Sequence, residues 1–369
     1  MSHRVAFGVI GGYGATGRNA VAELLRSTSG DILIGGRNEA KARAAATESD
    51  GRVSASRVDV LDPNSLNEFC CRCFVIVNCA SPVMVLEDRV AQAAWQARCH
   101  YVDAASLLIV KDRMAPQSQT IKEAKLSFVM SAGWLPGMSE LLPLYAHALA
   151  GTKMDAIESS TMYFGDTSDW SDNAFQEAAW LMRRLGQSRR GYFRKGEWVR
   201  EGIFSAAREA DLGNPIGRQR FYLFSNPELS EIGSRLNDCT LSAYACVPGL
   251  RTMVASSLIS LFPISEKRAG RLLQNSFRKN RLPVGGFVVV QVQGSSQGRK
   301  RSLRVQLIYK DGKEYWINGV VPATVARMIS DGQVQPGLNY LASAVDPLCF
   351  VAELRLAGVE LAEVFEPAG

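Results

Sequence analysis

The sequence predicts an α/β protein with a Rossmann-type doubly wound parallel sheet, followed by a second α+β domain built on an antiparallel sheet. Three observations predict this fold class. The first 132 residues alternate apolar strands with helical patterns, a glycine-rich turn joins the first strand to the first helix, and strand-like runs follow one another directly after residue 132. The length of 369 residues favours two domains.

The strands of the first part are short apolar runs, as expected where a parallel sheet is covered on both faces. The expected strands are 5–10, 31–34, 53–60, 75–79, 101–103 and 127–131. The expected helices are 19–26, 39–46, one that opens at Asp62-Pro63, and 87–97.

Strand patterns dominate the second part. The expected strands are 157–164, 286–292, 303–309 and 314–319, and the expected helices are 174–184 and 265–280. The turn Lys310-Asp311-Gly312-Lys313 predicts a hairpin between the last two strands. We therefore predict a Rossmann domain over 1–132 and a second domain over 133–335. The amphipathic C-terminal segment, 336–369, is expected to pack back on the first domain.

Composition narrows the classes of partner. The net charge of +6 is spread thinly, and the basic run 298–301 is interpreted as a strand-end or loop cluster, so no nucleic-acid partner is expected. No apolar segment approaches the roughly 20 residues that span a bilayer, and the N-terminal run is too short for a signal peptide. We expect a cytoplasmic protein without a membrane partner.

Cysteine usage indicates no metal site. The chain has 8 Cys and 3 His, and the cluster Cys70, Cys71 and Cys73 lacks the paired spacing of zinc ligands. These residues lie at the entrance to a predicted strand, where cysteine behaves as a small buried hydrophobe. We interpret them as reduced structural thiols.

The turn Gly12-Tyr13-Gly14-Ala15-Thr16-Gly17 predicts a dinucleotide site, because it directly follows an apolar strand and opens a helix. The first glycine permits a tight turn and the second lets the backbone approach a pyrophosphate. The third lets the helix pack close to the strand, and free N–H groups at the helix N-terminus face the phosphates.

The end of the second strand predicts NADP(H) as the cofactor. An NAD enzyme usually has Asp or Glu there, which would repel a 2′-phosphate, whereas this chain has Arg37 followed by Asn38. A guanidinium pairs with a phosphate through its planar fork, and Asn38 offers a second donor. Asp59-Val60 is expected to flank the adenine, and Asn78-Cys79-Ala80-Ser81-Pro82 is expected to line the nicotinamide half.

Four segments together resemble the saccharopine dehydrogenase-like oxidoreductases. They are 9–14 with 16–18, 36–38, 78–82 followed by 100–103, and 133–139, which contains a Gly-x-x-Pro-Gly turn. The resemblance implies hydride transfer between a nicotinamide and a C=N bond, typically of an amino-acid-derived imine. It also implies that the second domain serves the substrate, and the family's precedent allows a homodimer through that domain.

The chain departs from this pattern after Asp103. Many members continue with Asp-x-x-Gly-Glu, whereas this chain has Asp103-Ala104-Ala105-Ser106-Leu107. Asp103 remains the main candidate for a catalytic acid or an amine anchor, because it ends a strand at the ligand-binding edge of the sheet. A turn cap is the equally weighted alternative, and Tyr101 is a weaker polar candidate.

Further candidates lie after residue 132. Gly133 and Trp134 are expected to form a wall facing the cofactor, with core packing as the alternative for Trp134. Pro136, Tyr163 and Arg190 are candidates for substrate binding, and an arginine such as Arg190 suits a substrate carboxylate. Solvated surface is the alternative for Tyr163 and for Arg190.

Three other functions stay open at this point. A short-chain dehydrogenase needs Tyr and Lys four residues apart on a helix, and the match, Tyr309 with Lys313, falls on the predicted hairpin turn. An enoyl or keto reductase acting on a carrier-bound acyl or polyketide chain fits the same family. A cofactor-binding sensor or scaffold without catalysis is the alternative from another class.

Overall fold

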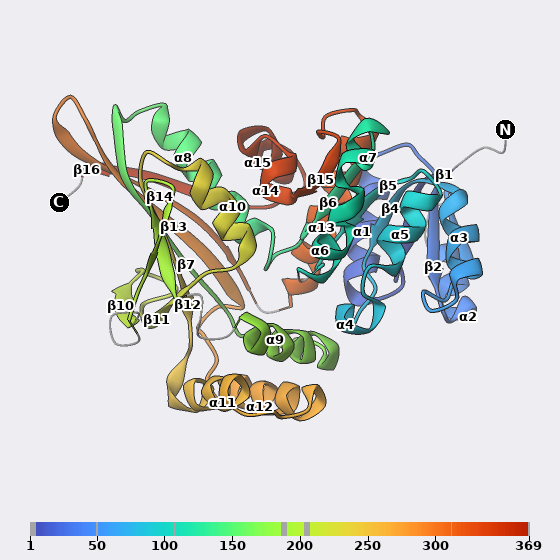
Figure 1. The fold of residues 1–369 in the computed structure, drawn as a ribbon, viewed down its shortest axis with the longest axis horizontal. Helices are drawn as coiled ribbons and strands as arrows, with labels where there is room; N and C mark the ends of the chain where they lie inside the picture. The colour runs from blue at the N-terminus through green and yellow to red at the C-terminus, as the bar shows by residue number, and fades with distance from the viewer. Residues whose placement is uncertain are drawn as a thin grey trace. The chain divides into compact units, whose positions relative to one another are not determined.

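The computed structural model describes residues 5–48, 51–106, 108–185, 190–202, 207–310 and 312–367. The chain divides into two compact units that interleave in sequence (Figure 1). Unit 1 comprises 1–138 with 315–359, and unit 2 comprises 139–314 with 360–369.

Unit 1 is built on a seven-stranded sheet in which every paired strand runs parallel to its neighbour, in the order β15-β6-β5-β4-β1-β2-β3. Its strands are β1 Val5–Ile10, β2 Ile32–Gly36, β3 Val53–Arg57, β4 Cys73–Asn78, β5 His100–Asp103, β6 Ser127–Met130 and β15 Gly337–Tyr340. The strand order reverses between β1 and β4, and ligands of open α/β sheets bind at the carboxyl ends of the strands at such a point.

Helices cover both faces of this sheet (Figure 1). They are α1 Ala15–Ser27, α2 Glu39–Thr47, α3 Pro63–Cys71, α4 Val83–Leu86, α5 Arg89–Gln96, α6 Ile109–Met114, α7 Ser118–Glu123, α13 Glu314–Ser330, α14 Leu341–Ala344 and α15 Pro347–Leu356, with a 3-10 turn at Ala115–Gln117. Cys70 and Cys73 are buried free thiols within the core on one face of the sheet, beside Phe69 and Ile76. Cys71 is an exposed free thiol.

The predicted strand 314–319 is wrong, because these residues begin the long helix α13. The hairpin predicted before it is therefore also wrong, and Asp311 of that turn lies outside the described residues. Gly319 explains the packing of the helix: a Cβ there would lie 2.5 Å from Asn19 Cβ and 2.6 Å from the Thr16 carbonyl oxygen. Helix α13 thus approaches the first turns of α1 closely.

The structural boundaries differ from the predicted ones for two reasons. Residues 133–138 fold back onto unit 1, where the Ala132 amide donates to the Asp103 carbonyl and the Met138 amide donates to the Gly133 carbonyl. Helix α13 also belongs to unit 1. The C-terminal segment is shared, since β15 pairs with β6 in unit 1 whereas residues 362–367 pair with a strand of unit 2.

Unit 2 contains a nine-stranded sheet with the order β10-β11-β12-β7-β13-β14-β16, in which β8 also pairs with β12 and β9 pairs with β8. Its strands are β7 Ala156–Asp166, β8 Gly191–Arg194, β9 Glu197–Arg200, β10 Ala207–Asp211, β11 Arg218–Phe224, β12 Thr240–Cys246, β13 Gly286–Ser296, β14 Arg299–Tyr309 and β16 Ala362–Pro367. Its helices are α8 Met138–Gly151, α9 Asp172–Leu185, α10 Pro227–Arg235, α11 Gly249–Leu261 and α12 Glu266–Lys279.

The predicted fold class is confirmed, with one refinement in the second sheet. Strand β12 runs parallel to β7, so the sheet is mixed, whereas the other pairs are antiparallel. The basic run 299–301 opens β14 and is solvent-exposed. Helices α9, α11 and α12 pack on one another through a small apolar core of their own (Figure 1). Among the helices described, none is both long enough and apolar enough to cross a membrane.

Candidate dinucleotide site of unit 1

The glycine turn lies at the carboxyl end of β1, at the reversal of strand order. Gly11 has a φ of +77°, and a Cβ on it would lie 3.0 Å from the backbone of Cys79, so the turns after β1 and β4 lie against each other. The Gly14 amide donates to the Gly11 carbonyl at 2.9 Å. A Cβ on Gly17 would overlap that same carbonyl oxygen, which explains why the helix can begin so close to the strand.

The N-terminus of α1 is suited to an anion. Gly14 is its N-cap, no side chain caps it, and its first turn contains no acidic residue. The equivalent helices after β2 and β3 differ, because Asn38 caps α2 and Asp62 caps α3 through their side chains. The N–H groups of α1 therefore remain available for a pyrophosphate, and the helix dipole favours negative charge there.

The end of β2 presents Arg37 next to this turn. The Tyr13 ring packs over Gly36, where a Cβ would overlap it, and the Tyr13 hydroxyl accepts a hydrogen bond from the Asn38 amide at 3.1 Å. Within the described ranges, the exposed Arg37 guanidinium has no hydrogen-bond or ion-pair partner. The oxygen of the Asn38 side chain caps α2 by accepting from the Lys41 amide at 3.0 Å. Arg37 is therefore a candidate partner for a 2′-phosphate.

The residues expected near the adenine follow β3. The Asp59 carboxylate accepts from the Leu61 amide at 3.0 Å, and its own amide donates to the Ser65 hydroxyl at 3.2 Å. The Val60 side chain is buried. The two residues thus form an ordered turn at the carboxyl end of the strand.

The segment expected near the nicotinamide follows β4. The Cys79 amide donates to the Ile10 carbonyl at 2.9 Å, and the Ala80 amide donates to the Asn78 side-chain oxygen at 3.2 Å. Ser81 is exposed, and Pro82 is the N-cap of α4. Asn78 therefore fixes the start of this loop.

Asn78 also links this loop to a buried polar cluster at the ends of β4 and β5, which comprises Asn78, Tyr101 and Asp103. The amide nitrogen of Asn78 donates to the Tyr101 hydroxyl at 3.1 Å and to Asp103 Oδ2 at 3.2 Å. The Tyr101 hydroxyl donates to the same carboxylate oxygen. All three side chains are at most 3% exposed.

Asp103 also holds the loop that follows β5. Its Oδ1 accepts from the amides of Ala105 at 2.9 Å and Ser106 at 2.8 Å. Burial, followed by the adjacent carboxylate, raises the pKa of Tyr101 well above its ordinary value, so its phenol stays protonated and donates. These contacts are those of a turn cap at the ligand edge of the sheet. Leu107, the next residue of that segment, lies outside the described residues.

The Gly-x-x-Pro-Gly turn forms a compact loop in unit 1. Gly137 has a φ of +127°, and a Cβ on it would overlap backbone oxygens of Ser131 and Gly133. The Trp134 amide donates to the Asn318 side-chain oxygen of α13 at 2.8 Å, and the Trp134 side chain is 1% exposed. The burial agrees with core packing of this tryptophan, while Pro136 is partly exposed.

Sequence reasoning placed Asn78 in the segment expected to line the nicotinamide half, but it did not predict the hydrogen bonds of Asn78 to Tyr101 and Asp103. It missed Asn318 altogether, because this residue lies on the helix predicted as a strand. Its contact with Trp134 spans 184 positions of sequence.

Residues 7–129 match the family described as the saccharopine dehydrogenase NADP binding domain. This segment is therefore a domain of the saccharopine dehydrogenase-like type. The match spans β1 to β6 of unit 1 and includes the glycine turn, Arg37 and the Asn78–Tyr101–Asp103 cluster. Unit 1 is thus an NADP-binding domain, and the chain is an oxidoreductase with a nicotinamide dinucleotide cofactor.

Solved structures share this fold over nearly the whole chain. A saccharopine dehydrogenase (L-Glu forming) from Saccharomyces cerevisiae has 14% identity and a TM-score of 0.67, covering 98% of this chain and 100% of that one. A probable dehydrogenase from Thermotoga maritima has 12% identity and a TM-score of 0.50, covering 97% and 98%. A myo-inositol dehydrogenase from Corynebacterium glutamicum has 10% identity and a TM-score of 0.50, covering 99% and 100%. Comparison with curated proteins found no match.

The family match ends before unit 2, which contains two of the substrate-binding candidates. Tyr163 of β7 is fully buried, with its ring 4.9 Å from Phe221 and 5.7 Å from Tyr244, and its hydroxyl has no partner among the described residues. Arg190 is partly exposed just before β8, where its carbonyl accepts from the Glu201 amide. The preceding residue, Arg189, lies outside the described residues.

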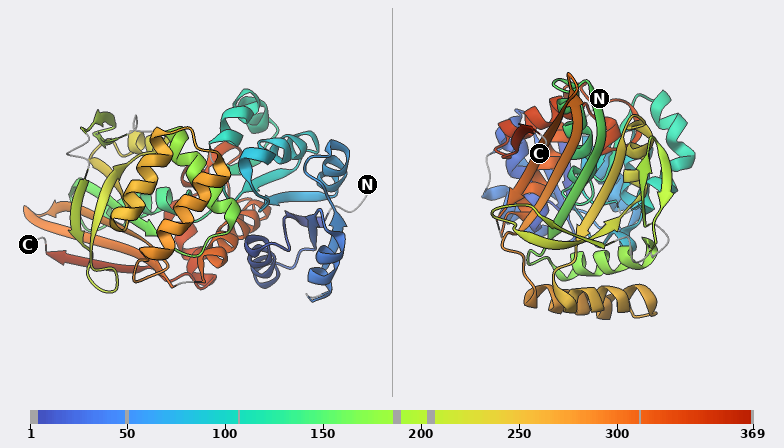
Figure 2. Two further views of the ribbon diagram at one scale, coloured as in Figure 1. Left: turned by 90° about the horizontal axis from the view of Figure 1, so that it is seen from below. Right: turned by 90° about the vertical axis from the view of Figure 1, so that its left-hand side faces the viewer.

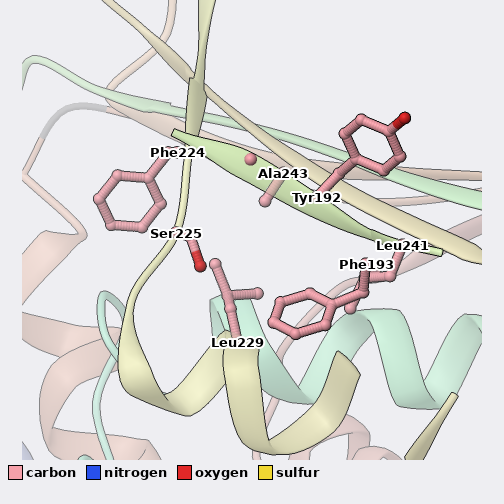
Figure 3. A pocket seen from close by; sticks show the side chains of 8 residues that line it. Tyr192, Phe193, Phe224, Ser225, Leu229, Leu241 and Ala243 are labelled. Atoms are coloured by element: carbon pink, nitrogen blue, oxygen red, sulfur yellow. The ribbon is translucent and has the colours of Figure 1, made fainter. Parts of the chain in front are cut away.

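A small pocket lies next to Arg190, between β8, β12 and α10 (Figure 3). Its lining is mostly apolar and includes Phe193, Leu229 and Leu241, and Figure 3 shows the Ser225 hydroxyl directed toward it. That hydroxyl is buried without a partner among the described residues. The Arg190 side chain is not part of the lining.

A second buried polar cluster lies in unit 2, around Asp166. Its carboxylate accepts from the Ser168 amide at 2.9 Å, from Trp170 Nε1 at 3.0 Å and from the Tyr309 hydroxyl. Burial raises the pKa of Asp166 to about 6, although these hydrogen bonds lower it. The cluster joins the ends of β7 and β14 to the loop before α9.

One group of potential metal ligands occurs in the part of the chain that the structure describes, formed by His147, Asp238 and Cys239. Nε2 of His147 lies 3.3 Å from the Asp238 carboxylate, and Nδ1 lies 3.9 Å from the Cys239 sulfur. The two ring nitrogens of His147 thus face different partners. Three ligands of one ion would instead direct one atom each toward a common point.

Proposed function

We propose that this protein is an NADPH-dependent reductase that transfers hydride to the C=N bond of an amino-acid-derived imine or a related unsaturated substrate. The observation that carries this proposal is the uncapped N-terminus of α1 beside the unpaired Arg37. The bound dinucleotide supplies the hydride, and the residues of unit 1 hold it at the carboxyl edge of the sheet.

Arg37 supports NADPH over NADH. It takes the place of the carboxylate that binds the ribose 2′-hydroxyl in NAD enzymes, and it has no competing ion pair within the described ranges. Asn38 fixes the geometry of this turn, because its amide donates to the Tyr13 hydroxyl and its side-chain oxygen caps α2. NADP use favours reduction as the natural direction.

The shared fold supports the substrate class. The Saccharomyces cerevisiae structure is named for a reaction that forms L-Glu, and it covers both units of this chain. The missing Gly-Glu after Asp103 means that the chain does not place the family's glutamate near the substrate. Asp103 accepts hydrogen bonds from two backbone amides and from the side chains of Asn78 and Tyr101. We therefore assign it a positioning role for the loops at the nicotinamide end.

The test is NADPH oxidation with a panel of imines, keto acids and enoyl thioesters. We expect turnover of amino-acid-derived imines with NADPH and much weaker turnover with NADH. Turnover of enoyl thioesters alone would replace the proposed substrate with an acyl chain. Binding of NADPH without turnover of any class would support a sensor and contradict the proposed reductase.

A further inference from the structure

The helical hairpin formed by α11 and α12 exposes a row of large apolar side chains. Five of them on α11 and just after it are between 38 and 69% exposed: Leu250, Val254, Leu258, Leu261 and Phe262. Four of the five follow the three- and four-residue spacing of one helix face. The opposite face of α11, with Thr252, Ala255 and Ile259, is buried.

Helix α12 exposes a basic row in the same layer. Its buried face, with Ala269, Leu273 and Phe277, packs in the apolar core shared with α9 and α11. Its exposed face is basic and comprises Lys267, Arg268, Arg271, Arg278 and Lys279. Arg278 lies 3.7 Å from Asp169. In the described part of the chain, the other four have no ion-pair partner.

The two rows face outward together. Figures 1 and 2 show α11 and α12 side by side, with α9 packed against the same side of both. Because the buried face of each helix is directed toward that shared core, the apolar row and the basic row lie on the outer surface of the pair. We call this surface the hairpin face.

The charge of the molecule is concentrated in this hairpin. Residues 249–281 contain seven Lys or Arg and one acidic residue, Glu266, giving a net charge of +6. The whole chain also has a net charge of +6, so the rest of it is formally neutral. Glu266 is already paired with Arg183 at 2.6 Å. An anionic partner is therefore attracted to this hairpin.

We propose that the hairpin face binds the surface of a bilayer rich in anionic phospholipids, with the α11 row inserted among the acyl chains and the α12 row among the headgroups. A helix that lies in the membrane interface combines an apolar face with Lys and Arg at headgroup depth. Apolar side chains that point outward from a helix suit a fluid hydrocarbon phase, which needs no complementary pocket.

Charge argues against two other occupants. A second copy seated symmetrically on this face would bring two groups of net charge +6 together, which is unfavourable. Nucleic acid would satisfy the cations but would leave Leu250, Leu261 and Phe262 against phosphate and water. An acidic protein partner would satisfy both rows only through a matching apolar surface, and the test below separates it from lipid.

The experiment is cosedimentation of the full chain with vesicles of phosphatidylcholine alone or of phosphatidylcholine mixed with phosphatidylglycerol. We expect binding to the anionic vesicles, little binding to the neutral ones, and weakening as NaCl is raised. The double variants Leu250→Ser with Leu261→Ser and Lys267→Glu with Arg271→Glu should each weaken binding by about tenfold or more.

Two controls carry single substitutions of the same kinds outside the hairpin face. Leu356→Ser alters an apolar side chain that is 72% exposed on α15, and Lys300→Glu alters the basic run of β14. Both should bind vesicles like the parent. All variants should retain NADPH binding, because the changed residues are exposed and lie outside the dinucleotide site.

Three outcomes would overturn the proposal. The first is absence of binding to anionic vesicles, and the second is equal loss in the controls and the hairpin variants. The third is a parent protein that does not bind vesicles but forms a dimer, or a complex with an acidic protein, and loses that association in the hairpin variants. None of these outcomes depends on the proposed reductase activity.

Discussion

Arg37 is the residue on which cofactor choice depends. Substitution Arg37→Ala removes the unpaired guanidinium but leaves Tyr13, Gly36 and the Asn38 cap in place. We expect NADPH affinity to fall by about tenfold or more, because a charge-assisted hydrogen bond contributes roughly 1.5–3 kcal/mol. NADH affinity should change little. Fluorescence titration with both cofactors measures the ratio.

Arg43→Ala is the matched control for this variant. Arg43 is an exposed arginine of α2 that already pairs with Glu39 at 2.6 Å. Its loss should leave both affinities near those of the parent. An unchanged NADPH/NADH ratio in Arg37→Ala would contradict the assignment of that residue.

Substitution of Asp103 distinguishes a positioning role of this residue from a role as catalytic acid. In Asp103→Asn, one oxygen can still accept from Ala105 and Ser106, but the other position becomes an amide that faces the donors Asn78 and Tyr101. We expect the melting temperature and kcat to fall while the pH dependence of kcat/KM keeps its shape. Tyr101→Phe removes a single donor and should have a smaller effect on both.

The opposite pattern would assign chemistry to Asp103. If the variant lost one limb of the pH profile while its melting temperature stayed at the parental value, the carboxyl group would be the proton donor. Stopped-flow pH profiles and calorimetry on the same samples distinguish the two.

At the scale of helices and strands, the N-terminal part of unit 1 was predictable because its local signals agree. The apolar run of β1, the glycines of the turn and the apolar spacing of α1 each predict locally the element that the structure contains. Asp62 and Pro63 likewise predict the start of α3, and the structure has Asp62 as its side-chain cap. The cofactor edge follows from this order, since the strand ends of a parallel sheet meet there.

Helix α13 shows where such signals fail. Its β-branched and aromatic residues are typical of a strand, and it contains Pro322. Ile317, Val321 and Val325 are all buried, so the helix has no broad polar face to reveal a period of 3.6. Tertiary packing on α1 selects the helix. Asn318, which holds the Trp134 amide, was hidden for the same reason.

The Asp166 cluster makes the stability of unit 2 depend on pH. The pKa of Asp166 is raised from its ordinary 3.8 to about 6, chiefly by burial, so the folded state holds the proton more tightly than the unfolded chain. This contribution to the free energy of unfolding is present below pH 4 and is lost as the pH rises through about 6. The loss is on the order of 3 kcal/mol.

Substitution Asp166→Asn should flatten that dependence between pH 4 and pH 7, because an amide keeps the acceptor for Ser168 and Trp170 without a titrating charge. Denaturant unfolding at a series of pH values measures it. Asp169→Asn, in the same loop but 61% exposed, should retain the parental slope. A parental slope in Asp166→Asn would mean that another group carries the pH dependence.

At the scale of the whole molecule, the chain interleaves two units, so sequence position does not report which unit a segment stabilises. The last described strand, β16, pairs with β14 in unit 2, and Tyr145 donates to Glu363 there. The preceding segment, 315–359, completes unit 1 through α13 and the sheet strand β15. A pair of truncations follows directly from this arrangement.

A chain ending at Val359 should keep NADPH affinity within about twofold of the parent, since unit 1 is complete and the loss is one edge strand of unit 2. A chain ending at Glu314 should lose NADPH binding, although no residue of the glycine turn is removed. Without α13, the close packing of Gly319 on α1 disappears, the Trp134 amide loses Asn318, and β6 becomes an edge. Isothermal titration with NADPH, with circular dichroism as the check on folding, compares the two. Equal binding by both truncations would show that the glycine turn is organised by residues before 139 alone.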